Sequence, residues 1–138
     1  MQVIKVPGLN NLEKNNGCRD AGNALIAELR NIWSSEKGKI IESELLDLEE
    51  IHVDNENLEE QEKLIYKNSL EAFEKQEKIV FLGGDHSISY ETFSNNKCEG
   101  LLVFDAHPDV YQEFKTATHL DWLKFLIAIV IFILILFI

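Results

Sequence analysis

Two short apolar segments constrain the fold of this chain more than any other feature. Apart from its first lysine, segment 78–82 (KIVFL) is wholly apolar, and segment 101–104 (LLVF) is apolar throughout. A strand with one wet face alternates apolar and polar residues, whereas a strand of a parallel sheet is covered on both faces and does not. We therefore expect both segments to be strands of a parallel sheet with helices on its two sides.

Further strands and helices are predicted to alternate along the chain. Segment 2–6 (QVIKV) reads as a strand, and another lies within 45–53. A helix is expected from residue 21, a strongly amphipathic one over 56–77, and a third over 87–93 with Ser87 as its cap. The apolar face of the first helix would comprise Ala24, Leu25, Ala27, Leu29, Ile32 and Trp33. The pattern predicts a three-layer α/β domain over residues 1–125.

Length and composition narrow the class of protein. A chain of 138 residues suffices for one domain with a core. Its net charge of -11, with lysines and arginines scattered among acids, argues against binding to nucleic acid, which requires a basic face. Cys18 and Cys98 have neither disulfide-framework nor zinc-ribbon spacing, and no signal peptide is read at the N-terminus. We expect a cytoplasmic protein.

Polar side chains follow both apolar strands, at the edge of a parallel sheet where ligands collect. Gly83 and Gly84 permit a sharp turn that presents His86 beyond the first strand. After the second, Asp105, His107 and Asp109 alternate, so an extended backbone would place them on one face. Two carboxylates and an imidazole that converge need a cation among them. Manganese, iron or zinc suits such mixed ligands.

The motifs GGDHS (83–87) and DAHPD (105–109), in this order and at this separation, resemble the signatures of the arginase/agmatinase (ureohydrolase) family. The resemblance implies an arginase-like fold, incomplete at the C-terminus, with a two-manganese site. In that site His86 would bind one metal and His107 the other. Asp105 would bridge both metals, and Asp109 would complete the coordination of the first. Asp85 would orient His86 or the turn rather than bind metal.

The resemblance also implies a reaction. The family hydrolyses a guanidino C–N bond: a metal-activated hydroxide attacks the guanidinium carbon of a small-molecule substrate, and urea and an amine leave. Asp109 would hold the hydroxide by a hydrogen bond, and His119 would protonate the leaving amine. The family has glycine after that histidine where this chain has Leu120, and His119 could equally begin a helix. The full-length family members are expected to form homo-oligomers.

The C-terminal segment leaves several interpretations open. The family takes further aspartate ligands from a D-x-D-x-x-D-P segment, which this sequence lacks, and segment 125–138 (FLIAIVIFILILFI) is wholly apolar. We favour a frameshifted or truncated tail over residues 126–138. A buried core element and a marginal membrane anchor, with Trp122 and Lys124 at the interface, are the alternatives. The chain would then be either an amidino hydrolase or a non-catalytic metal-binding or membrane-tethered remnant of one.

Overall fold

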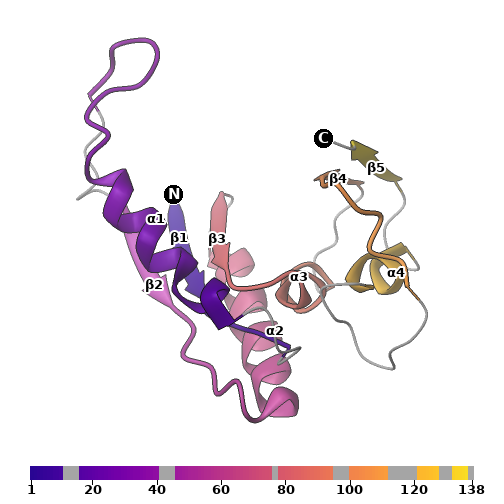
Figure 1. Ribbon diagram of the computed structural model, residues 1–138. Helices are drawn as coiled ribbons and strands as arrows, with labels where there is room; N and C mark the ends of the chain where they lie inside the picture. The colour runs from indigo at the N-terminus through magenta and orange to yellow at the C-terminus, as the bar shows by residue number, and fades with distance from the viewer. Residues whose placement is uncertain are drawn as a thin grey trace.

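In the part of the chain that the structure describes, parallel strands form two sheets (Figure 1). The first sheet has the order β2-β1-β3, formed by Asp47–Glu50, Gln2–Val6 and Ile79–Gly83. In the second, β4 (Gly100–Phe104) pairs with β5 (Phe132–Leu136), again in parallel. The computed structural model describes residues 1–10, 16–40, 46–75, 78–94, 100–111, 121–127 and 132–136. The predicted α/β class with a parallel sheet is confirmed.

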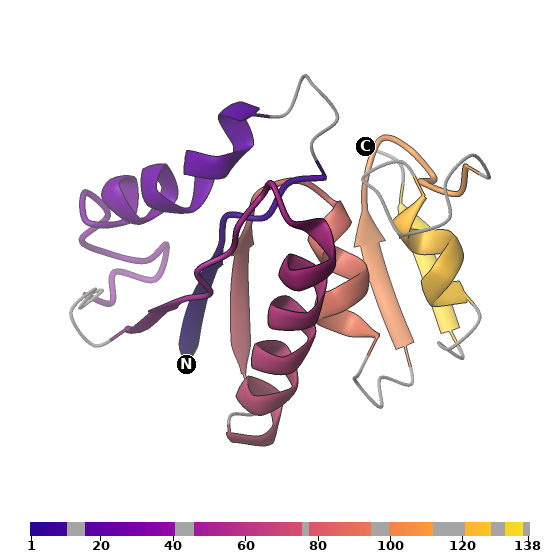
Figure 2. The same ribbon diagram turned by 90° about the horizontal axis from the view of Figure 1, so that it is seen from below.

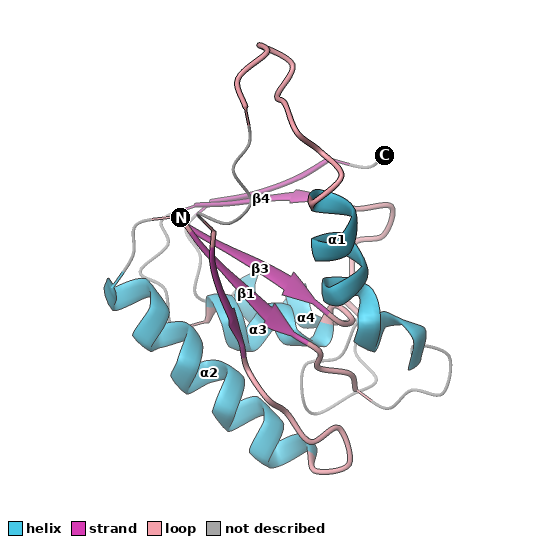
Figure 3. Ribbon diagram, turned by 90° about the vertical axis from the view of Figure 1, so that its left-hand side faces the viewer, coloured by secondary structure: helices cyan, strands magenta, loops and turns pink. Residues whose placement is uncertain are grey.

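Helices flank the first sheet on both sides. The helix α1 (Ala21–Leu29), preceded by the 3-10 helix η1 (Asn16–Asp20), and the long helix α2 (Leu58–Lys75) lie on opposite sides of β1 and β3 (Figure 3). Two shorter helices, α3 (Ser87–Phe93) and α4 (Trp122–Ile127), continue the α2 layer toward the second sheet. In Figure 2, α3 lies between β3 and β4, and α4 lies beside β4.

The first core lies between the first sheet and α2. Strand β1 is buried along almost its whole length, and α2 turns a stripe at helical spacing toward it, including Ile65 and Ala72. Burial of each large aliphatic side chain contributes about 1.5–3 kcal/mol to folding. The buried apolar residues of this core are Ile4, Val6, Ile51, Ile65, Ala72 and Ile88.

A second, smaller core lies under β4. Val103 packs there with Trp122, Leu123 and Leu126 of α4, all at most 7% exposed. The opposite face of β4 is open, because Leu102 and Phe104 remain 54% and 59% exposed. The expectation that segment 101–104 is covered on both faces is therefore wrong for this face. Alternate side chains of a strand point to opposite faces, and α3 and α4 cover one of them.

Two helix expectations also need correction. The first helix ends at Leu29, so Ile32 and Trp33 lie beyond it and are 48% and 77% exposed instead of completing an apolar face. At the start of α3 the cap position belongs to His86, and Ser87 is the first helical residue. Its hydroxyl and amide instead bind the carboxylate of Asp85, which precedes the turn.

The apolar C-terminal segment contributes the end of α4 and the strand β5. Residues 132–136 form a strand that pairs with β4, whereas residues 128–131, 137 and 138 lie outside the described part. Trp122, expected at a membrane interface in the anchor interpretation, is instead buried at 3% exposure. Within the described ranges, the helices are all too short or too polar to cross a membrane.

Candidate metal centre

The turn between β3 and α3 carries the first ligand, and Asp85 fixes its shape. The Asp85 carboxylate accepts hydrogen bonds from the backbone N–H of Ser87 (2.9 Å) and from that of Asn10 (3.0 Å). The backbone N–H of Asp85 donates to the carbonyl of Gly8 at 3.1 Å. This pattern agrees with the orienting role expected for Asp85, and it holds His86 at the carboxyl edge of the sheet.

The partner of this turn, the loop 7–10, is itself held from the other side. Asn55 accepts a hydrogen bond from the N–H of Leu9 (2.7 Å) and donates one to the carbonyl of Pro7 (3.0 Å). Gln61 of α2 donates to the carbonyl of Leu9 at 3.0 Å. Without these two side chains, the backbone groups of the loop would be buried with no hydrogen-bond partner. The loop therefore forms a fixed support beneath the β3–α3 turn.

The loop after β4 carries the other expected ligands, and it is not extended. The chain bends at residues 106 and 107, where the Asp105 carboxylate accepts the N–H of His107 at 3.0 Å. Asp109 has φ of 45°, in the left-handed region that aspartate tolerates better than most residues. The prediction that an extended backbone aligns these three side chains is therefore wrong. A local side chain–backbone hydrogen bond replaces the strand geometry.

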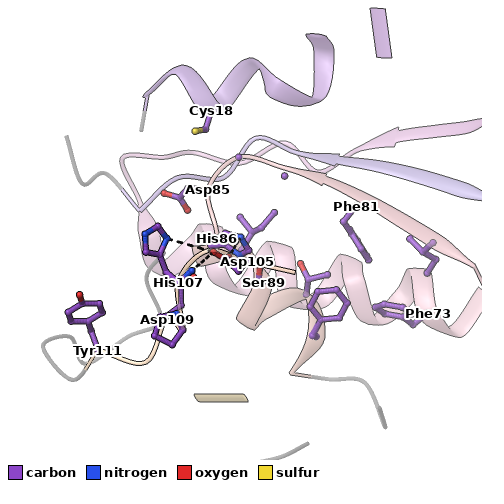
Figure 4. Close-up of a pocket in the computed structure, with 17 residues that line it drawn as sticks. Cys18, Phe73, Phe81, Asp85, His86, Ser89, Asp105, His107, Asp109 and Tyr111 are labelled. Carbon is purple, nitrogen blue, oxygen red and sulfur yellow. Dashed lines mark hydrogen bonds and ion pairs between the residues drawn. The ribbon is translucent and has the colours of Figure 1, made fainter. Parts of the chain in front are cut away.

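Three of the expected ligands meet at this edge. One ligand atom from each of His86, Asp105 and Asp109 lies within 4.8 Å of the other two. Nε2 of His86 is 3.1 Å from Oδ2 of Asp105, which lies between the two imidazoles (Figure 4). His107 stays outside the group: its Nδ1 is 3.8 Å from Oδ1 of Asp105 and its side chain is 77% exposed. His119 lies outside the described residues.

The donor chemistry of the group fits a divalent transition metal. Asp109 is buried and the side chain of Asp105 is only 13% exposed, so both carboxylates have lost much of their hydration. Two poorly hydrated anions this close together are stabilised by a cation between them. The other ring nitrogen of His86 lies 3.3 Å from the hydroxyl of Ser89, a partner that can orient the imidazole as outer-shell groups do for histidine ligands.

Trp122 is a further member of the site that the sequence did not reveal. Its indole N–H donates to Oδ2 of Asp109 at 2.8 Å, and its ring stacks on that of His86 with centroids 5.1 Å apart and planes 13° apart. The two contacts join α4 to both loops. Since 13 residues separate Trp122 from Asp109, no local spacing rule could have paired them.

A cavity of about 830 Å³ opens beside the group. One wall carries His86, Asp105 and Asp109, and the remainder is largely apolar, with Phe81 and Phe93 among its side chains. Cys18, a free cysteine, also lines it. An apolar pocket with a few convergent polar groups is the usual form of a small-molecule site.

Comparisons with solved structures show the same fold elsewhere. A formimidoylglutamase from Bacillus subtilis superposes with a TM-score of 0.78 at 21% identity, over 98% of this chain and 46% of that one. The proclavaminate amidino hydrolase from Streptomyces clavuligerus superposes with a TM-score of 0.79 at 15% identity, over 98% of this chain and 50% of that one. An arginase from Medicago truncatula superposes with a TM-score of 0.71 at 19% identity, over 98% of this chain and 48% of that one. The chain thus spans about half the length of these structures.

The sequence matches a family model, although it matches no individual curated protein. No curated protein sequence matches the chain significantly. The model of the arginase family, however, matches residues 1–129, which include both loops of the site and the start of the apolar segment. The chain therefore belongs to the arginase family.

Proposed function

We propose that this chain provides part of the active site of a manganese-dependent hydrolase that cleaves a guanidino C–N bond and releases urea and an amine. The observation that carries the proposal is the convergence of His86, Asp105 and Asp109 within 4.8 Å at the carboxyl edge of the strands. Family membership and the adjoining cavity support it.

The chain's own residues would hold the metal and orient the reactants. His86, Asp105 and Asp109 are proposed ligands, with His107 as a fourth after rotation of its exposed side chain. Manganese bound there supplies a water of lowered pKa as the nucleophile. Asp109 would hold that water by a hydrogen bond, and His119 would donate the proton to the leaving amine.

The ligand set of this chain is partial for a site with two ions. The family resemblance implies two manganese ions, and the D-x-D-x-x-D-P carboxylates that would complete them are absent from this sequence. The proposal therefore assigns to this chain the His86–Asp105–His107–Asp109 portion of the site. Binding of metal without turnover is the second candidate, and the partial ligand set favours it for the chain alone.

The substrate proposed is a small guanidino compound. Such a substrate is cationic, and a chain with a net charge of -11 attracts cations over long range. The apolar wall of the cavity would pack against a carbon chain attached to the guanidinium group. A homo-oligomer is part of the same proposal, by resemblance to the family.

Calorimetric titration with Mn²⁺ tests the proposal. Asp105→Asn keeps the shape of the side chain and removes its charge. We expect it to weaken Mn²⁺ binding by more than the roughly 10–100-fold that is typical for loss of an outer-shell partner. The matched control is Asp47→Asn on β2, an exposed carboxylate away from the site, which should bind as the unchanged protein does. Equal affinity in all three proteins would refute the site.

Urea release separates the two candidates. The Mn²⁺-loaded chain would be incubated with arginine or agmatine, and urea would be measured. Urea that disappears in Asp105→Asn supports the hydrolase. Manganese binding without urea from either compound would favour the non-catalytic metal-binding protein.

A further inference from the structure

We propose that Trp122 is a positioning residue of this centre, which holds one oxygen of Asp109 and one face of His86 so that the ligand atoms converge. The inference rests on the proposed metal site. It concerns a helix, α4, that carries none of the proposed ligands. Its evidence is the geometry of two contacts made by one buried side chain.

The first contact selects the oxygen of Asp109 that remains for a metal. The indole N–H has no acceptor capacity and donates in one direction, so its 2.8 Å hydrogen bond engages Oδ2 of Asp109. Oδ1 then keeps all of its lone pairs for a cation, whereas Oδ2 shares its own with the indole. A buried hydrogen bond to a carboxylate is stronger than a neutral one and holds the carboxylate plane.

The second contact restricts the imidazole. The indole of Trp122 lies nearly parallel to the ring of His86, with 13° between the planes. Stacking leaves the ring free to slide but opposes rotation out of the plane. With Ser89 next to Nδ1, the arrangement directs Nε2 toward Asp105. The ring of His86 is thus held by groups on α3 and α4 together.

The indole can act in this way because it is itself immobile. Trp122 is 3% exposed, and Leu123 and Leu126 beside it are at most 1% exposed. Both pack with Val103 of β4, the strand that leads into Asp105. Because the packed core fixes the position of the indole, the indole in turn fixes the positions of the ligands that it contacts. Outer-shell partners of this kind are worth about 10–100-fold in metal affinity.

The substitution Trp122→Phe isolates the hydrogen bond, since phenylalanine keeps an aromatic ring but lacks the N–H. We expect it to weaken Mn²⁺ binding, measured by calorimetry, by about tenfold. Trp33→Phe is the matched control, because Trp33 is the other tryptophan of the chain and is 77% exposed. It should leave the affinity unchanged. Equal affinity of Trp122→Phe and the unchanged protein would overturn the positioning role.

Proton–nitrogen NMR of the two indole N–H groups provides a readout that does not depend on the fold of Trp122→Phe. In the metal-free protein, Asp109→Asn should move the Trp122 signal and leave that of Trp33 in place. Stoichiometric paramagnetic Mn²⁺ should broaden Trp122 selectively. An indole signal unmoved by Asp109→Asn would overturn the contact.

The two proposals can fail separately. If Mn²⁺ binds and Asp105→Asn abolishes binding while Trp122→Phe does not alter it, the metal site stands and the role of Trp122 is refuted. If Mn²⁺ does not bind at all, the proposed function fails, and the positioning role fails with it even where the NMR signal shows that the indole contact is present.

Discussion

The two loops that carry the candidate ligands are fixed by different means. The β3–α3 turn is held by backbone contacts with the loop 7–10 and by hydrogen bonds to Asp85. The loop after β4 has a local turn around Asp105 and is then tied to α4 through Trp122. The first loop depends on close approach of main chains and on its own Asp85, whereas the second depends on a side chain of another element, α4.

This difference predicts where the site is sensitive to mutation. A support made of main-chain contacts fails when any extra atom enters, because backbones cannot move apart without breaking the sheet. A support made of packed side chains loses stability in proportion to the volume that is removed. The predictions that follow test this contrast, and their expected effects decrease from the first to the last.

Gly84→Ala should have the largest effect. A Cβ at residue 84 would lie 2.1 Å from the carbonyl oxygen of Gly8, a backbone atom that the surrounding hydrogen bonds hold in place. We expect a loss of about 3 kcal/mol in the free energy of unfolding, measured by urea denaturation, from this overpacking. Gly17→Ala is the control, since a Cβ at residue 17 meets no atom within 4 Å. Similar losses in both variants would contradict the main-chain support.

Leu126→Ala tests the side-chain support. Leu126 is fully buried with Trp122 under β4, and its truncation should cost about 2–3 kcal/mol through lost burial and the cavity left behind. The near-ultraviolet circular dichroism of Trp122 should weaken at the same time. Leu102→Ala, at a leucine 54% exposed on β4, should cost less than about 1 kcal/mol. An unchanged tryptophan signal in Leu126→Ala would show that the indole is held by other contacts.

The sequence could predict the first loop better than the second, for a physical reason. Apolar strands, paired glycines and the spacing to His86 are local, so they can be read along the chain. The left-handed Asp109 and its indole partner depend on where α4 packs, which no spacing encodes. The open face of β4 was missed for the same reason. An apolar strand shows that burial is favourable, but not which neighbours exist to bury it.

Glu91→Gln tests whether the stability of the protein depends on pH through α3, the helix that follows the first loop. Burial, and to a lesser extent the charge of Glu62, raises the pKa of Glu91 from 4.5 to about 7. A raised carboxyl pKa favours the neutral form in the folded state, so stability falls as the pH rises from 4.5 to about 7. Glutamine removes that loss.

We expect Glu91→Gln to exceed the unchanged protein by about 1 kcal/mol in unfolding free energy at about pH 8, a value reduced for partial exposure of the carboxyl. Well below pH 4.5, where the carboxyl is neutral in both states, the two proteins should be equally stable. Urea denaturation across this pH range measures the difference. A difference in unfolding free energy that does not depend on pH would show that Glu91 does not titrate with a raised pKa.

His107→Ala should have the smallest effect on stability and the clearest bearing on the second loop. With its side chain 77% exposed, truncation should change the free energy of unfolding by less than about 0.5 kcal/mol. If His107 swings in as a ligand, the same change should weaken Mn²⁺ binding by about tenfold or more. His52→Ala is the control, an exposed histidine of which the side chain contacts Glu50 rather than the site. Equal Mn²⁺ affinity in both variants would confine the ligands of this chain to His86, Asp105 and Asp109, the three whose ligand atoms already converge.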